Sequence, residues 1–204
     1  MIHDLSVQLV SAARDTSWVE IIAAGLAAVY LLLAIPQRLE CWAAAFVSSC
    51  LYVGVLFGAH LYMESALNAF YAAMAVYGFW QWQGGGGAVL AVRRWPMMHH
   101  LAGFSSVIAL SVVSAYFLRR FTPAAWPFVD SMVTWSSVFA TFLVARKVYE
   151  NWYWWLVIDS VSLCLYHARG LYLTMLLFGL YLVLILIGIR QWRRTLPPPI
   201  HAAG

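Results

Sequence analysis

Long apolar runs alternate with short polar segments along the chain, and their lengths predict helices that cross a membrane. Each run is about as long as the roughly 20 helical residues needed to span the hydrocarbon of a bilayer. The runs are continuous, whereas a transmembrane β-barrel has short segments of alternating polarity. We predict seven spans, at residues 18–35, 40–58, 62–82, 99–118, 127–146, 151–168 and 171–190.

The chain matches itself without a gap when it is shifted by 110 positions. Between the windows 40–82 and 150–192, 10 of 43 residues are identical, and most are residue types that chance rarely pairs. Internal repetition in an apolar chain is typical of transporters, in which two similar halves enclose a site near the middle of the membrane. The identical pairs include Glu40 and Glu150, Trp42 and Trp152, Tyr71 and Tyr181, Gly78 and Gly188, and Trp82 and Trp192.

This offset maps the first three predicted spans onto the last three and leaves the fourth unmatched. Matched spans are four helices apart and therefore run in the same direction, so the halves are parallel repeats. We expect an all-α integral membrane fold of 3+1+3 type, with a linker helix between two three-helix repeats. The predicted segments are an extracytoplasmic segment 1–17, a first repeat 18–82, a loop and linker helix 83–126, a second repeat 127–192 and a cytoplasmic tail 193–204.

Composition supports a membrane protein. Hydrophobic residues make up 64% and charged residues 10% of the chain, against roughly 45–50% and 25% in soluble domains. So few charges could not cover a water-soluble fold of this size. The net charge of +4 comes from residues between the spans and not from one basic face, which disfavours a nucleic-acid partner.

The distribution of Lys and Arg predicts the orientation, because cytoplasmic loops are enriched in both. Four basic residues lie on the N-terminal side of the predicted spans and eight on the other side. We therefore expect an extracytoplasmic N-terminus and a cytoplasmic C-terminus. The two groups are Arg14, Arg119, Arg120 and Arg169, and Arg38, Arg93, Arg94, Arg146, Lys147, Arg190, Arg193 and Arg194.

Three predicted spans carry polar or aromatic side chains at helical spacing. Ionisable groups inside a membrane cost at least about 2.5–3.5 kcal/mol on insertion scales, so lipid does not accept such faces and we expect them to converge. Aromatic faces with a few amide and carboxylate groups suit a flat, partly polar or cationic heterocycle. The faces are Trp152, Trp155, Asp159, Ser162 and Tyr166; Glu64, Asn68, Tyr71 and Gly78; and Asp130, Thr134 and Thr141.

Each polar residue also has a structural interpretation. Glu20, Glu64 and Asp130 lie near span ends, where solvation at the interface explains them as well as ligand binding does. Asn68 could bond a neighbouring helix. Asp159 lies about half-way along its span, which favours a role in a binding site.

Tryptophans at span ends can be interfacial anchors. We expect that role for Trp80, Trp82 and Trp192, whereas Trp152 and Trp155, taken alone, fit an anchor or a site equally well.

The sequence offers little support for a metal, cofactor or enzyme site. His99 and His100 are adjacent, so they point about 100° apart on a helix, and the other histidines are scattered. The glycines at 84–87 follow a helix and lack the Gly-Lys-Ser/Thr of a phosphate loop. No nucleophile and base can be placed at matching depth. We therefore predict no cofactor, no metal and no catalytic residues.

Several motifs together resemble the PnuC family of bacterial vitamin-precursor transporters. The resemblance extends from about residue 18 to 194, and its Glu-Asn-Trp and Trp-x-x-Trp core is fairly specific in combination. The motifs of the second half are Asp130-Ser131, Thr134, Ala145-Arg146-Lys147, Glu150-Asn151-Trp152, Trp155, Asp159 and Gly170-Leu171-Tyr172-Leu173-Thr174. Those of the first half are Asn68, Tyr71, Tyr77-Gly78-Phe79-Trp80 and Trp82.

The resemblance implies two three-helix bundles joined by a linker helix, similar to SWEET sugar transporters, and assembly into homotrimers. It also implies movement of nicotinamide riboside without an attached energy source. Trp152, Trp155, Asn68 and Asp159 match positions near the ligand of the family. The full set of candidate substrate-binding residues is Trp152, Trp155, Asp159, Asn68, Tyr71, Glu64, Asp130, Thr134 and Asn151.

We therefore expect facilitated diffusion of nicotinamide riboside through a bacterial inner membrane, with uptake driven by phosphorylation inside the cell. One departure keeps an alternative open, because the clearest nicotinamide riboside members carry Asn where this chain has Asp159. A carboxylate also suits thiamine, another aromatic cation and the cargo of the related PnuT proteins. An intramembrane enzyme and a structural scaffold are the alternatives from other classes.

Overall fold

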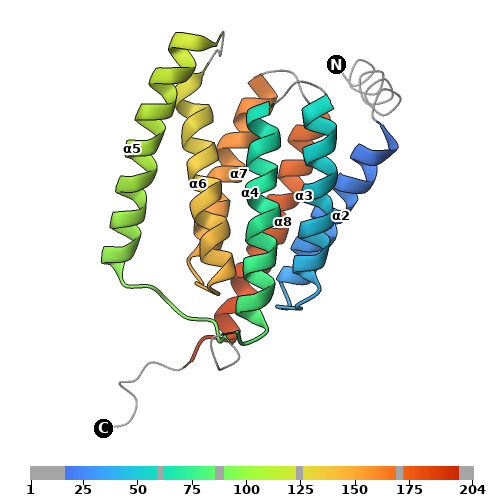
Figure 1. Cartoon of the computed structure of the whole chain (residues 1–204). Coiled ribbons are helices and arrows are strands. Elements are labelled where there is room, and N and C mark those ends of the chain that lie inside the picture. Colours follow the sequence, from blue (N-terminus) through green and yellow to red (C-terminus); the bar gives the residue numbers. More distant parts are fainter. Residues whose placement is uncertain (1–16, 59–61, 86–89, 123–125, 169–171, 198–204) are drawn as a thin grey trace.

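The structure is a computed structural model that describes residues 17–58, 62–85, 90–122, 126–168 and 172–197. Each predicted span coincides with one helix of the described chain. Residues Arg14 and Arg169, and most of the predicted terminal segments, lie outside the described residues. The helices are α2 (Trp18–Ala34), α3 (Cys41–Gly58), α4 (Tyr62–Trp82), α5 (Met97–Phe121), α6 (Pro127–Ala145), α7 (Asn151–Ala168) and α8 (Tyr172–Arg194) (Figure 1).

The helix ends differ most from prediction in α5 and α8. Pro96 stands at the N-cap of α5, so the helix begins at Met97, two residues earlier than expected. At the other end of α5, Arg119 and Arg120 remain helical. In α8 the helix continues through Arg193 and Arg194.

Four described helices are long and apolar enough to cross a membrane, namely α3, α5, α6 and the Met175–Arg194 part of α8. The apolar helix α2 is one residue shorter than α3, at 17 against 18 residues. Helices α4 and α7 are long but more polar, because they carry the predicted polar faces with Asn68 and Asp159.

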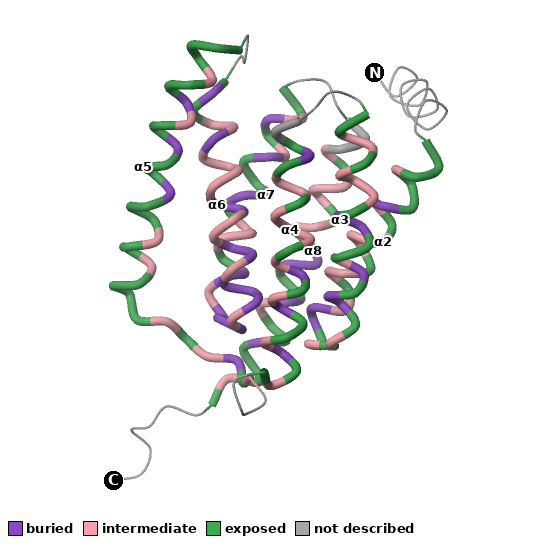
Figure 2. The backbone as a smooth tube through the Cα atoms, in the orientation of Figure 1, coloured by how far each residue is buried: buried purple, intermediate pink, exposed green. Residues whose placement is uncertain are grey.

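The helices pack in two sequential groups. Helix α3 packs against α2 and α4, and α7 packs against α6 and α8. Helix α5 packs against α6 at the edge of the bundle (Figure 1) and is largely exposed (Figure 2). Between the groups, α4 packs along α6, whereas α2 and α8 touch at few positions. The two groups therefore meet at a tight seam, formed by α4 and α6, and at a loose seam, formed by α2 and α8.

Equivalent turns follow α2 and α6. Gln37 and Lys147, which are 110 positions apart, both adopt a left-handed backbone, with φ of 61° and 48°. Beyond them, the N–H of Arg38 donates to the Leu33 carbonyl and the N–H of Val148 donates to the Leu143 carbonyl, both at 2.9 Å. Such bonds satisfy the last carbonyls of a helix. The sequence offset therefore coincides with equal backbone geometry at these two turns.

Four tryptophans, Trp42, Trp82, Trp152 and Trp192, form a layer at the end of the bundle where α4 and α8 finish. Trp42 meets Trp82 edge-on at 5.3 Å between ring centroids, and Trp152 meets Trp192 edge-on at 5.5 Å. Trp82 and Trp192 then contact each other at 6.1 Å. Trp82 is 5% and Trp192 is 0% exposed. The expectation that these two are interfacial anchors is therefore wrong, whereas Trp80 is half exposed.

The tryptophan layer also joins the two groups of helices by hydrogen bonds. The indole N–H of Trp192 donates to the carbonyls of Ala34, the last residue of α2, and of the C-cap residue Ile35, at 3.1 Å each. The indole N–H of Trp82 donates to the Val144 carbonyl in α6 at 3.3 Å. Positions 34 and 144 are again 110 apart, so the two groups exchange equivalent hydrogen bonds.

The segment before α5 fixes the start of α7. Arg93 pairs with Val148 in an isolated parallel bridge, with the Arg93 N–H donating to the Lys147 carbonyl at 3.0 Å. The backbone N–H of Trp95 donates to the Glu150 carboxylate at 3.2 Å. The Lys147 ammonium lies 4.6 Å from the centre of the Trp82 ring, and burial lowers its pKa. This turn is therefore held firmly at the position where α7 begins.

Candidate ligand-binding cavity

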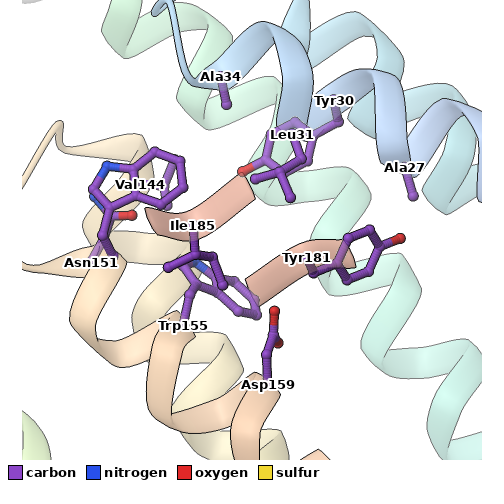
Figure 3. Close-up of a pocket in the computed structure, with 11 residues that line it drawn as sticks. Ala27, Tyr30, Leu31, Ala34, Val144, Asn151, Trp155, Asp159, Tyr181 and Ile185 are labelled. Carbon is purple, nitrogen blue, oxygen red and sulfur yellow. The ribbon is translucent and has the colours of Figure 1, made fainter. Parts of the chain in front are cut away.

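A cavity of about 110 Å³ lies between α2 and the second group of helices. It is several times larger than the space that one water needs. Helices α7 and α8 form one wall and α2 forms the facing wall (Figure 3). The lining residues are Ala27, Tyr30, Leu31, Ala34, Val144, Asn151, Trp152, Trp155, Asp159, Tyr181 and Ile185.

Helix α7 contributes most of the polar and aromatic groups. Asn151, Trp152, Trp155 and Asp159 all line the cavity, so four of the predicted substrate-binding residues lie together. Trp152, Trp155 and Asp159 follow one another at spacings of three and four, which places them along one side of the helix. Figure 3 shows the Asp159 carboxylate directed toward the space between Trp155 and Tyr181.

Asp159 is a buried acid in a mostly apolar setting. Its exposed fraction is 5%, and within the described part of the chain no Lys, Arg or His side chain forms a salt bridge with it. A buried carboxylate without a cation is costly unless a partner neutralises it. The arrangement is therefore suited to a ligand that brings its own positive charge.

Two tyrosines that are 110 positions apart differ in their relation to the cavity. Tyr181 lines the cavity, and Tyr71 stands at the equivalent position of α4. Tyr71 itself is not part of the cavity lining, so the convergence of the predicted faces of α4, α6 and α7 stays a prediction.

The other predicted residues lie away from the cavity lining. The Asn68 amide donates to the Glu64 backbone carbonyl at 2.9 Å, and the Thr134 hydroxyl donates to the Asp130 backbone carbonyl at 2.9 Å. Both side chains bond the preceding turn of their own helix. The Glu64 side chain is exposed, and that of Asp130 is half-buried. A direct ligand role for these four residues stays a prediction.

Glu20 has a local structural role. Its carboxylate accepts a hydrogen bond from the Ser17 N–H at 2.8 Å, and its own N–H donates to the Ser17 hydroxyl at 3.2 Å. This reciprocal pair is a capping box, which satisfies free N–H groups at the start of α2.

The sequence interpretation missed the wall that α2 provides. Tyr30 and Leu31 line the cavity, but α2 has no polar face that could have indicated this. Tyr30 packs on Trp42 at 5.9 Å between ring centroids. A signal did exist for Tyr181, because the 110-residue offset pairs it with the predicted residue Tyr71.

Four of the cavity residues have small counterparts at the 110-residue offset. Trp155, Asp159 and Ile185 correspond to Ala45, Ser49 and Ala75, and Tyr30 corresponds to Ala140. Ala75 and Ala140 are buried, at 1% and 0% exposure, in the helices of the tight seam. At these four positions the larger side chains and the Asp159 carboxyl group line the cavity beside the loose seam, whereas the tight seam carries alanines.

Metal binding has no support in the described residues, which contain no group of three or more His, Cys, Asp or Glu side chains able to hold an ion.

Comparisons with known proteins agree on one family. The family model described as "Nicotinamide mononucleotide transporter" matches residues 17–194. The riboflavin/roseoflavin transporter RibM of Streptomyces davaonensis is 26% identical over 195 residues, which cover 91% of this chain and 91% of that protein. The nicotinamide riboside transporter PnuC of Escherichia coli is 24% identical over 205 residues, with 87% and 86% covered.

The fold is also similar to a solved structure. The crystal structure of the vitamin B3 transporter PnuC superposes with a TM-score of 0.72 at 19% identity, covering 95% of this chain and 88% of that chain. At this level of identity the likeness concerns the fold.

Proposed function

The chain belongs to the nicotinamide mononucleotide transporter family, and from this membership we propose that it carries nicotinamide riboside across a membrane by facilitated diffusion. A similar protein from Escherichia coli is itself a nicotinamide riboside transporter. Nicotinamide riboside carries a positively charged pyridinium ring, an amide and a sugar. It therefore combines a flat cation with neutral hydrogen-bonding groups.

The observation that carries this proposal is the Asp159 carboxylate in the aromatic cavity. Trp152 and Trp155 offer ring surfaces for stacking, and cations bind favourably over such rings. Asp159 adds a negative charge within the same cavity. Because the lining is mostly apolar, water screens this charge poorly and its attraction for a ligand cation is strengthened.

We propose that the helices work as two three-helix repeats, 18–82 and 127–192, joined by a loop and linker helix at 83–126. The equal turn geometry of Gln37 and Lys147 supports this division, as do the exchanged hydrogen bonds of Trp82 and Trp192. Transport then proceeds as the repeats rock against each other around a fixed site. The loose seam between α2 and α8 is the part best suited to open.

The proposed orientation places the tryptophan layer toward the cytoplasm and the N-terminus outside, in a bacterial inner membrane. In this orientation the layer closes the cytoplasmic end of the cavity. Release of the ligand into the cell requires Trp82 and Trp192 to separate and their hydrogen bonds to the opposite repeat to break. The chain is proposed to act as a homotrimer, in which each copy holds its own cavity.

Net uptake needs a driving force, which we place outside the chain. Phosphorylation of the vitamin by a separate cytoplasmic kinase would trap it, because the phosphorylated product carries added negative charge. The carrier then only equilibrates the free ligand.

Thiamine is the second candidate cargo, because it is also an aromatic cation and suits Asp159 equally well. Riboflavin, which the similar protein RibM carries, has an uncharged ring system and leaves the Asp159 charge unmatched. An intramembrane enzyme or a scaffold is disfavoured, because the family is described as a transporter family.

Purified protein in liposomes tests the proposal. We expect it to exchange radiolabelled nicotinamide riboside across the bilayer without ATP or an ion gradient. Unlabelled nicotinamide riboside should compete, and riboflavin should not. If the protein exchanged thiamine but not nicotinamide riboside, the proposed cargo would be wrong and thiamine would replace it. Strict dependence of exchange on an ion gradient would refute facilitated diffusion.

A further inference from the structure

The side chain of Asn151 uses its N–H as a hydrogen-bond donor, whereas its carbonyl oxygen has no hydrogen-bond partner among the described residues. Its side-chain N–H donates to the Val148 carbonyl at 2.6 Å, which fixes the orientation of the amide. The Oδ1 atom is buried and has no hydrogen-bond partner among the described residues. Asn151 is 0% exposed and lines the cavity. The cavity therefore presents a hydrogen-bond acceptor of fixed orientation at the start of α7.

The turn itself does not require an asparagine. The equivalent position in the first half is Cys41, which is also fully buried. The N–H of Cys41 donates to the Arg38 carbonyl and the N–H of Asn151 donates to the Val148 carbonyl, both at 3.2 Å. The same turn thus forms with a side chain that lacks an amide. A buried acceptor left unpaired is costly, so its presence in this half needs another reason.

The cavity has different chemistry at its two ends along α7. Asn151 and Asp159 are eight residues apart, or about 12 Å along a helix axis. The Asp159 end attracts positive charge, whereas the Asn151 end accepts a hydrogen bond from a neutral donor. The tryptophan rings of α7 lie between them in sequence.

From this arrangement we propose that Asn151 determines specificity for the sugar part of the ligand, through a hydrogen bond from a ribosyl hydroxyl group to its Oδ1. The ligand then lies lengthwise along α7, with its charged ring at Asp159 and its sugar toward the tryptophan layer. This inference rests on the proposed transport of a cationic riboside. It adds the direction in which the ligand lies and the residue that distinguishes a riboside from a bare charged ring.

Two ligands and two variants test it. Nicotinamide riboside and 1-methylnicotinamide share the charged ring and the amide, but the second has a methyl group in place of the sugar. Asn151→Cys copies the side chain that the first half uses at the same turn, so we expect it to fold. Cys41→Ser, outside the cavity lining, is the matched control.

Binding to the purified, full-length protein is measured by calorimetry for the riboside and by competition for 1-methylnicotinamide. We expect Asn151→Cys to bind the riboside about two- to tenfold more weakly, the factor of one neutral hydrogen bond, and 1-methylnicotinamide as the wild type does. Cys41→Ser should change neither. Equal losses for both ligands, or unchanged riboside binding by Asn151→Cys, would overturn the assignment. Wild-type protein that binds no riboside would instead refute the proposed cargo.

Discussion

The ring of Trp152 lies directly against Gly188, in the space that a Cβ atom at this glycine would occupy. Trp42 lies against Gly78 in the same way, and the two pairs are related by the 110-residue offset. Glycine is required at both positions because a neighbouring ring approaches the helix backbone. In the second half this contact also positions a wall of the cavity, since Trp152 lines it.

Gly188→Ala should displace Trp152 and weaken ligand binding. The new methyl group collides with ring atoms that cannot move without disturbing Trp192. Overpacking of this kind typically costs about 1–3 kcal/mol, which a thermal unfolding curve of the purified protein would detect. Calorimetry on the folded variant should find weaker binding of nicotinamide riboside.

Gly179→Ala is the matched control in the same helix. A Cβ at Gly179 would meet its nearest neighbour, Cδ1 of Leu163, at 4.0 Å, which is an ordinary contact. We expect stability and binding close to those of the wild type. If the two alanine variants behaved alike, the Trp152–Gly188 contact would not hold the cavity wall in place.

Trp192→Phe should destabilise the closed tryptophan layer. The phenyl ring preserves much of the packing but loses the N–H that bonds the carbonyls of Ala34 and Ile35. One lost hydrogen bond is worth about 0.5–1.5 kcal/mol, so the melting temperature should fall. Trp126→Phe, at a half-exposed tryptophan, serves as the control. A fall of the same size in both variants would contradict a special role for Trp192.

Much of the fold could be predicted from the sequence, because lipid imposes length and polarity on every span. The spans were predicted from the apolar runs, and the equivalence of Trp42 and Trp152 was predicted from the 110-residue offset. The roles of Trp82 and Trp192 could not be predicted in this way. A tryptophan at a helix end looks the same in sequence whether it faces the membrane interface or packs between helices. Here the contact between Trp82 and Trp192 joins the two groups of helices, so both side chains are buried.

The site could be predicted only in part. Periodicity places Trp155 and Asp159 on one face of α7, and both line the cavity. The same rule selected Asn68 and Thr134, whose side chains bond the backbone of their own helices. Periodicity cannot separate these cases, because a polar group that bonds its own helix needs no partner across the bundle. The α2 wall escaped notice because its residues are mostly apolar.

Trp155→Ala should weaken binding of the aromatic ligand by about 1–3 kcal/mol, on the scale of base stacking on aromatic side chains. Trp155 lines the cavity beside Asp159, so its loss removes a stacking surface. Calorimetry on purified, folded protein measures the effect.

The neighbouring Trp154 provides the control. It packs edge-on against Phe139 at 4.9 Å between centroids and does not line the cavity. We expect Trp154→Ala to lower stability but to leave the affinity of the folded protein unchanged. Wild-type affinity in Trp155→Ala would remove this residue from the site.

A reporter fused to the C-terminus tests the proposed orientation. Helix α8 ends in Arg193 and Arg194, and basic residues concentrate on the cytoplasmic side. A fluorescent protein fused there should therefore fold and fluoresce, while a phosphatase that works only outside the cytoplasm should stay inactive. An active phosphatase fusion would reverse the orientation and with it the side that the tryptophan layer closes.

Asp159→Asn is the variant most informative about cargo recognition. The substitution preserves shape and most hydrogen bonding but removes the negative charge. If Asp159 attracts the ligand cation across a poorly screened cavity, only charged ligands should lose affinity. If Asp159 instead only stabilises the fold, the variant should be less stable and should lose the same affinity for charged and uncharged ligands.

The most direct test compares nicotinamide riboside with its reduced, uncharged form, by calorimetry on the wild type and on Asp159→Asn. We predict that the variant binds the charged riboside about tenfold more weakly or worse, a loss of about 1.4 kcal/mol or more, and binds the reduced form nearly as the wild type does. An equal loss for both ligands, together with a lower melting temperature, would contradict the recognition of a cation by Asp159.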